Sequence, residues 1–143
     1  MKQTDTDLTE TAGVEDNTAP RPLVAIVDDD ESVRTAVGSL FRSMGFRTKL
    51  FGGGKDFLDF SNVCEVSCLI LDVQMPGMDG LELQRRLASV RHQIPVVFIT
   101  AYGDENARAQ ALREGAVDFL SKPFCEDALL DAVKSVIEVG IRN

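Results

Sequence analysis

The sequence predicts an α/β domain: a doubly wound, five-stranded parallel sheet of the (βα)5 type, with helices on both faces. Three observations support this prediction. Short, wholly apolar runs recur along the chain, as in strands that are buried on both faces. Segments with apolar residues at helical spacing separate these runs. Glycine and proline fall between the two kinds of segment, and regular alternation of this kind favours a parallel sheet.

The first part of the domain alternates strand, helix, strand, helix. Residues 23–27 are five consecutive apolar residues that run into three aspartates, which predicts a buried strand. Apolar residues recur at helical spacing over 33–44, and Gly45 is placed to end that helix. Residues 46–50 alternate in type and predict a second strand. A run of three glycines breaks it, and a short helix is expected over 55–60.

The same alternation continues to the end of the chain. Residues 68–71 predict a third strand, and residues 96–99, which follow a proline, predict a fourth. Between them, a loop rich in glycine and proline leads into a helical stripe over 83–90. Residues 104–114 are alanine-rich and predict a helix that ends at a glycine. A fifth strand is expected over 117–120, and a last helix follows, with apolar residues on one face.

Charge divides the chain into two parts. Residues 1–21 are expected to be a disordered acidic leader, and residues 22–140 the folded domain. Fifteen basic and 23 acidic residues give the whole chain a net charge of −8. Binding to a phosphate backbone needs a basic face, so no direct contact with nucleic acid is expected on this chain.

Cysteines and hydropathy suggest a cytoplasmic protein. Cys64, Cys68 and Cys125 lack the further cysteine or histidine ligands of a zinc site, which favours reduced thiols. No apolar stretch approaches the ~18 residues of a membrane span, and no signal-peptide core follows the N-terminus. We therefore expect a cytoplasmic location and no membrane contact.

Polar side chains follow four of the five expected strands. Asp28 and Asp29 follow the first strand, Asp72 the third and Thr100 the fourth, while the fifth leads into Lys122. In a parallel sheet with helices on both faces, the site lies outside the carboxyl ends of the strands. The sequence therefore predicts that these five side chains meet at one edge of the sheet.

The residue types at this edge suit phosphoryl chemistry. Three carboxylates in one crevice repel each other unless a cation or a proton compensates, and hard oxygen ligands suit Mg²⁺. A carboxylate beside Mg²⁺ can act as a nucleophile toward phosphorus and form an aspartyl phosphate. Lys122 would supply positive charge to the transferred group, and Thr100 a hydrogen bond.

These residues, in this order and spacing, resemble the receiver domain of two-component response regulators. The resemblance covers about residues 22–138. The matching stretches are Val27-Asp28-Asp29, Leu71-Asp72-Val73-Gln74-Met75-Pro76-Gly77-Met78-Asp79-Gly80, Thr100-Ala101 and Lys122-Pro123-Phe124. The family's fold is flavodoxin-like, with strand order 2-1-3-4-5.

The resemblance also implies roles for individual residues. Asp72 would be the phosphoacceptor, with Asp28, Asp29 and the backbone carbonyl of Gln74 as further ligands of Mg²⁺. Thr100 and Phe119 would form a switch pair, and Lys122-Pro123 a cis peptide. Hydrolysis of the phosphate would need a water whose approach is bordered by Gln74 and Tyr102.

The implied function is phosphorelay signalling rather than enzymatic turnover of a substrate. The domain would catalyse only its own phosphorylation and dephosphorylation. Its phosphoryl donor would be a histidine kinase or a phosphotransfer protein. A homodimer or an effector protein would use the face formed by the fourth helix, the fifth strand and the fifth helix.

Two other classes of protein share parts of this pattern. Asp28-x-Asp30-x-Ser32 is similar to the nucleophile motif of haloacid-dehalogenase-type phosphatases, which would place the aspartyl phosphate on Asp28. That class needs a further acidic pair after the lysine strand, whereas Glu126-Asp127 is expected to open a helix. A flavodoxin-type electron carrier shares the expected architecture, but acidic residues after the first strand would repel the flavin phosphate.

Overall fold

The computed structural model describes residues 21–89, 93–101 and 105–142, and the side chains as far as residue 137. The strands are β1 (Leu23–Val27), β2 (Arg47–Phe51), β3 (Val66–Leu71), β4 (Val96–Thr100) and β5 (Asp118–Ser121). The helices are α1 (Glu31–Ser43), α2 (Gly54–Leu58), the 3₁₀-helix η1 (Val63–Glu65), α3 (Gly80–Ser89), α4 (Glu105–Arg113) and α5 (Glu126–Arg142). The predicted alternation of strands and helices is confirmed.

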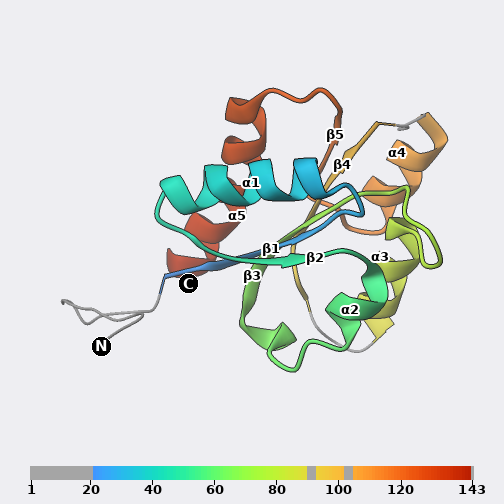
Figure 1. Ribbon diagram of the computed structural model, residues 1–143, viewed down its shortest axis with the longest axis horizontal. Helices are drawn as coiled ribbons and strands as arrows, with labels where there is room; N and C mark the ends of the chain where they lie inside the picture. The colour runs from blue at the N-terminus through green and yellow to red at the C-terminus, as the bar shows by residue number, and fades with distance from the viewer. Residues whose placement is uncertain (1–20, 90–92, 102–104, 143) are drawn as a thin grey trace.

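The strands form one sheet with the order β2-β1-β3-β4-β5 (Figure 1). Every neighbouring pair is parallel, and Val27 at the end of β1 is level with Phe51 of β2 and Leu71 of β3. The flavodoxin-like order is therefore confirmed. Because all strands run the same way, the residues that follow them lie at a common edge.

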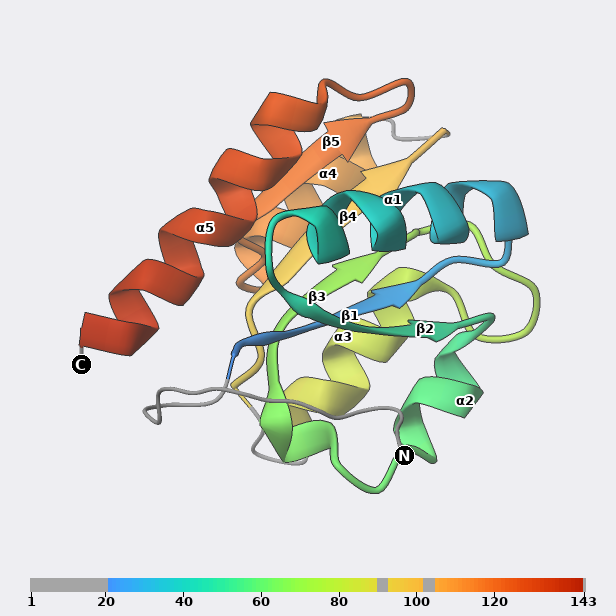
Figure 2. The ribbon, with the colours of Figure 1, turned by 60° about the vertical axis from the view of Figure 1, so that its left-hand side comes forward.

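Side chains alternate between the two faces of the sheet, and each face has its own core. Val24 and Ile26 of β1 pack on one face with apolar residues of α1 and α5. Ala25 and Val27 pack on the other face with residues of α2, α3 and α4. Figure 2 shows α1 and α5 on one side of the sheet and α2 and α3 on the other. All five residues of β1 are buried, as the apolar run predicts for a central strand.

Local chemistry explains where the helices end. Gly45 and Gly115 follow α1 and α4 with φ of 93° and 103°, a left-handed conformation that glycine adopts without a steric penalty. Both predicted helix ends are therefore confirmed. At the other end of α1, the Asp30 carboxylate accepts hydrogen bonds from the backbone N–H groups of Ser32 and Val33, which makes it the N-cap.

The bounds of most elements differ from the expectations by one to three residues, as β3 and α2 illustrate. β3 begins at Val66, two residues before the predicted start, and the turn η1 precedes it. α2 ends at Leu58 rather than at Phe60, because Phe60 turns its ring onto Phe51 of β2, with centroids 5.3 Å apart. Burial of an aromatic ring thus ends this short helix before its predicted end.

Several expectations fall outside the described residues. The leader expected over residues 1–21 lies there except for Arg21, as do Val90, Tyr102 and Asp104. The limits of the domain at residues 22 and 140 stay predictions, and α5 runs to Arg142. Within the described ranges, none of the helices combines the length and the apolar character needed to cross a bilayer.

Candidate functional site

The carboxyl edge of the sheet brings the predicted acidic residues together. One carboxylate oxygen from each of Asp28, Asp29 and Asp72 lies within 4.8 Å of the others. Asp28 is completely buried and Asp72 is 5% exposed, whereas Asp29 is exposed. Asp29 and Asp72 line an open cleft of about 590 Å³, whose walls include Gln74, Met75, Ala101 and Lys122.

Lys122 holds the positive charge of this site. Its Nζ atom donates to Asp28 Oδ2 at 3.0 Å and to Asp72 Oδ2 at 3.4 Å. The Lys122 side chain is only 16% exposed. Burial alone would lower the pKa of Lys122, but the hydrogen bond to Asp28 and the nearby carboxylates outweigh burial and raise it. Lys122 is therefore charged at neutral pH and forms ion pairs with two of the three carboxylates.

The pKa of Asp72 is raised, as expected of a buried carboxylate. Burial raises the pKa of Asp72 above its usual range, and the negative charge of Asp28 raises it further. The charge of Lys122 and hydrogen bonds from the Gln74 backbone N–H (3.2 Å to Oδ1) and the Thr100 hydroxyl act in the opposite direction. The predicted neighbours of Asp72 are thus in contact with it, while the Gln74 carbonyl stays a proposed ligand.

Asp28 is fixed by contacts that the sequence analysis did not identify. Its Oδ1 atom accepts the backbone N–H of Asp30 at 2.9 Å, and its backbone carbonyl accepts Arg34 Nη1 at 2.8 Å. Asp30 itself caps α1 and does not join the acidic group. The only sequence signal for this cap is an aspartate just before a helix.

The loop 75–80 has a structural explanation, residue by residue. Gly77 has φ of 80° and makes the turn, and Asp79 Oδ1 accepts the Glu82 backbone N–H at 2.9 Å at the start of α3. Gly80 packs against the Asp72 backbone, because a Cβ atom built on it would lie 2.2 Å from the Asp72 carbonyl oxygen. The loop therefore brings the first residue of α3 into contact with the backbone of Asp72.

Thr100 and Phe119 are neighbours of this site on adjacent strands. Both are buried, and the Phe119 ring packs against Phe98 with centroids 5.8 Å apart. Arg108 of α4 donates from Nη1 to the Phe119 backbone carbonyl at 2.9 Å, which ties α4 to β5. The Phe119 side chain is thus packed in the interior of the domain. The Lys122-Pro123 peptide is cis, as the resemblance implied.

Comparisons with known proteins agree with this geometry. The model of the response regulator receiver domain family matches residues 24–134. This chain belongs to the response regulator receiver family. It is a signalling module rather than a catalytic enzyme, and Asp28, Asp29 and Asp72 form its acidic pocket. The phosphatase and flavodoxin alternatives are therefore wrong.

Individual relatives of this receiver domain have similar sequences and folds. The response regulator protein TmoT of Ectopseudomonas mendocina is 44% identical over 118 residues, which cover 82% of this chain and 54% of TmoT. The solved structure of the response regulator StyR is 44% identical, with a TM-score of 0.78, and covers 86% of this chain and 62% of StyR. That of FixJ-N is 34% identical, with a TM-score of 0.76 and coverage of 84% and 96%. The chain spans about half the length of the curated relatives it matches.

The raised pKa of Asp72 predicts a dependence of stability on pH. Above the usual pKa of 3.8, folded Asp72 binds more protons than unfolded Asp72, so the free energy of unfolding falls as the pH rises through the folded pKa. Asp72→Asn should therefore raise the melting temperature of the metal-free protein at neutral pH, and this gain should shrink as the pH falls toward 3.8. Calorimetry of both proteins measures it. A variant that melts below the wild type at neutral pH would contradict the prediction.

Proposed function

We propose that this receiver domain takes part in phosphorelay signalling by accepting a phosphoryl group on Asp72. The observation that carries the proposal is the position of Asp72, whose carboxylate lies beside Lys122 and two further carboxylates at the mouth of a cleft. A nucleophile toward phosphorus needs access from solvent and a compensating charge. Asp72 lines the open cleft and pairs with Lys122, whereas Asp28 is completely buried and does not line the cleft.

The transfer itself is a displacement at phosphorus. A carboxylate oxygen of Asp72 attacks the phosphorus of a phosphohistidine, a P–O bond forms as the P–N bond breaks, and the electron pair returns to the imidazole. Lys122 Nζ lies 3.4 Å from Asp72 Oδ2, where its positive charge would stabilise the negative charge of the transferred phosphoryl group. The Thr100 hydroxyl, which bonds Asp72, would be available to a phosphoryl oxygen.

Mg²⁺ is the metal that fits the acidic pocket best. Three carboxylate oxygens within 4.8 Å of one another are hard ligands, and the open cleft leaves room for water and phosphate oxygens. Asp28, Asp29 and Asp72 would hold the ion, together with the Gln74 carbonyl. When bound, it neutralises charge on the transferred group. Lys122 pairs with Asp28 and Asp72, and its single positive charge leaves a net negative charge on the three carboxylates for the cation.

We propose the class of the phosphoryl donor and the surface that transmits the signal from the chemistry of the site. A histidine kinase or a phosphotransfer protein would supply the phosphoryl group. The signal would leave through the face of α4, β5 and α5, to an effector protein or a second copy, because Arg108 and Phe119 connect that face to the site. A cytoplasmic location stays a prediction from the sequence.

Incubation with acetyl phosphate tests this function directly. With Mg²⁺ present, the intact mass should increase by one phosphoryl group, and hydroxylamine should remove it, as expected of an acyl phosphate. A chelator should prevent the gain. Phosphate that resists hydroxylamine, or a gain that is unaffected by the chelator, would contradict the proposal.

Metal binding is expected to stabilise the fold independently of phosphorylation. A ligand that binds only the folded state adds about 2.7 kcal/mol at a hundredfold excess over its Kd, which raises the melting temperature by several degrees. Asp29→Asn should remove most of this gain, because it removes an exposed ligand without breaking an ion pair. Asp56→Asn, on an exposed residue of α2 outside the acidic pocket, is the control and should keep the gain. Equal Mg²⁺ responses of Asp29→Asn and the wild type would contradict the assigned ligands.

A further inference from the structure

A basic cleft lies at the edge strand β2, at the opposite end of β1 from the acidic pocket. It has a volume of about 630 Å³ and includes Leu23 at the start of β1. Four basic residues line it: Arg21, Arg42, Arg47 and Lys49. Glu65 is its only acidic lining residue among those described. Such a concentration of positive charge on a chain of net charge −8 favours an anionic ligand.

Most of this positive charge has no carboxylate partner within the part of the chain that the structure describes. Arg47 Nη1 lies 3.8 Å from Glu65 Oε1. Arg42 donates only to neutral hydroxyls, those of Thr48 (3.0 Å) and Ser39 (3.3 Å). Lys49 lies over the ring of Phe60, with Nζ 5.9 Å from its centroid. The cleft therefore presents cationic groups that remain available to an incoming carboxylate.

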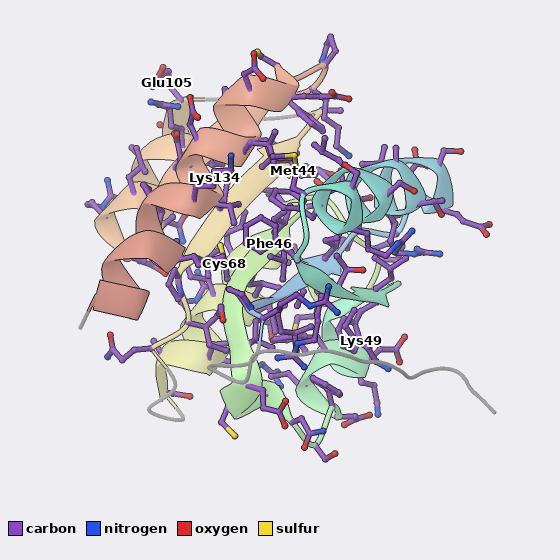
Figure 3. All side chains as sticks on the ribbon, turned by 90° about the vertical axis from the view of Figure 1, so that its left-hand side faces the viewer. Met44, Phe46, Lys49, Cys68, Glu105 and Lys134 are labelled. Carbon is purple, nitrogen blue, oxygen red and sulfur yellow. The ribbon has the colours of Figure 1, made fainter. Side chains whose placement is uncertain are left out.

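The same cleft offers apolar and backbone contacts suited to a peptide. Phe46 and Phe60 line it and are partly buried. Figure 3 labels Phe46, just before β2, and Lys49 on β2. β2 is the last strand on its side of the sheet, so one edge of its backbone has no neighbouring strand among the described residues. A strand edge of this kind binds extended peptides.

We propose that the cleft binds the acidic N-terminal segment of this same chain, residues 1–20. That segment carries a net charge of −4, and its apolar residues Leu8 and Val14 suit the exposed parts of the two phenylalanine rings. Its charged residues are Lys2, Asp5, Asp7, Glu10, Glu15 and Asp16. It joins the domain at Arg21, which itself lines the cleft. An extended chain spans ~3.3 Å per residue, so the segment reaches every part of the cleft.

Covalent attachment to the domain favours the N-terminal segment over a separate acidic protein as the occupant of the cleft. Exposed ion pairs are individually weak, too weak for tight binding between molecules at ordinary concentrations. A short flexible tether raises the effective concentration of the segment to the order of millimolar, at which a few weak pairs suffice. Salt screens such pairs, with a Debye length of about 3 Å at 1 M. The docking should therefore be intramolecular and sensitive to salt.

Paramagnetic broadening in the full chain tests the proposal. A spin label is placed at Thr11→Cys, with the exposed Cys64 and Cys125 replaced by serine, since the buried Cys68 is protected from labelling. Amide signals of residues 42–49 and 60–65 should lose intensity at low salt and regain it at about 1 M salt. Changing the five acidic residues of the segment to their amides should abolish the loss.

Matched variants of the domain complete the experiment. Arg42→Gln with Lys49→Gln should also abolish the broadening, whereas Arg113→Gln with Lys55→Gln, which removes the same charge elsewhere, should preserve it. If the variant with Arg42→Gln and Lys49→Gln does not fold, the variant with the neutralised N-terminal segment tests the proposal by itself. Broadening spread evenly over the surface, broadening that survives the neutralised segment, or broadening transferred between labelled and unlabelled copies in a mixed sample would each overturn the proposal.

Discussion

Replacing Asp72 with asparagine is expected to reduce phosphate incorporation from acetyl phosphate or a histidine kinase to background. The change keeps the shape of the side chain but removes the nucleophilic oxygen that the transfer requires. It also leaves Lys122 paired with Asp28, at 3.0 Å, so the fold should survive. Intact-mass spectrometry of wild type and variant after the same incubation measures the effect.

The control for this variant is Asp56→Asn. Asp56 lies on α2, is exposed and is not one of the three carboxylates of the acidic pocket. It removes the same charge, so it should incorporate phosphate as the wild type does. Wild-type incorporation by Asp72→Asn, with the phosphate mapped elsewhere, would mean that Asp72 is not the acceptor.

Replacing Gly80 with alanine should displace Asp72 without touching its side chain. The new Cβ would lie 2.2 Å from the Asp72 carbonyl oxygen and 3.1 Å from the Phe98 ring, so either α3 or the backbone after β3 must shift. Overpacking of this kind costs about 1–3 kcal/mol. We expect a lower melting temperature and, because the carboxylate moves away from Lys122, markedly slower phosphate incorporation.

Gly53→Ala is the matched control for Gly80→Ala. A Cβ atom at Gly53 meets nothing within 4 Å, and its φ of −168° is extended backbone that any residue adopts. Its stability and phosphate incorporation should stay close to those of the wild type. If Gly80→Ala behaved like Gly53→Ala in both measurements, the close packing of α3 on Asp72 would not position the carboxylate.

The pattern of apolar and polar residues along the chain was sufficient to predict the sheet and the acidic pocket. Short, wholly apolar runs such as 23–27, which alternate with helical segments, favour strands in the interior of a sheet covered on both faces. Once these strands are parallel, residues that follow them, such as Asp28 and Asp72, must meet at one edge. This part of the prediction depends on the periodicity of apolar residues, which is local in the sequence, and on the parallel arrangement that follows from it.

Other features depend on contacts that no local pattern encodes. Asp30 entered the sequence analysis only in the motif of the phosphatase alternative, and its carboxylate caps α1. Arg34 reaches back to the Asp28 carbonyl, which only the orientation of α1 on the sheet determines. The packing of the Phe119 ring against Phe98 depends likewise on the pairing of β4 with β5. Each of these contacts follows from the placement of side chains in three dimensions.

Locating the phosphoryl group in the wild-type protein tests the central claim most directly. Borohydride reduces an aspartyl phosphate to homoserine, which marks the modified residue in peptide fragment spectra. After incubation with acetyl phosphate and Mg²⁺, we expect homoserine at position 72 and unmodified aspartate at positions 28 and 29. Homoserine at Asp28 or Asp29, with Asp72 unchanged, would contradict the account.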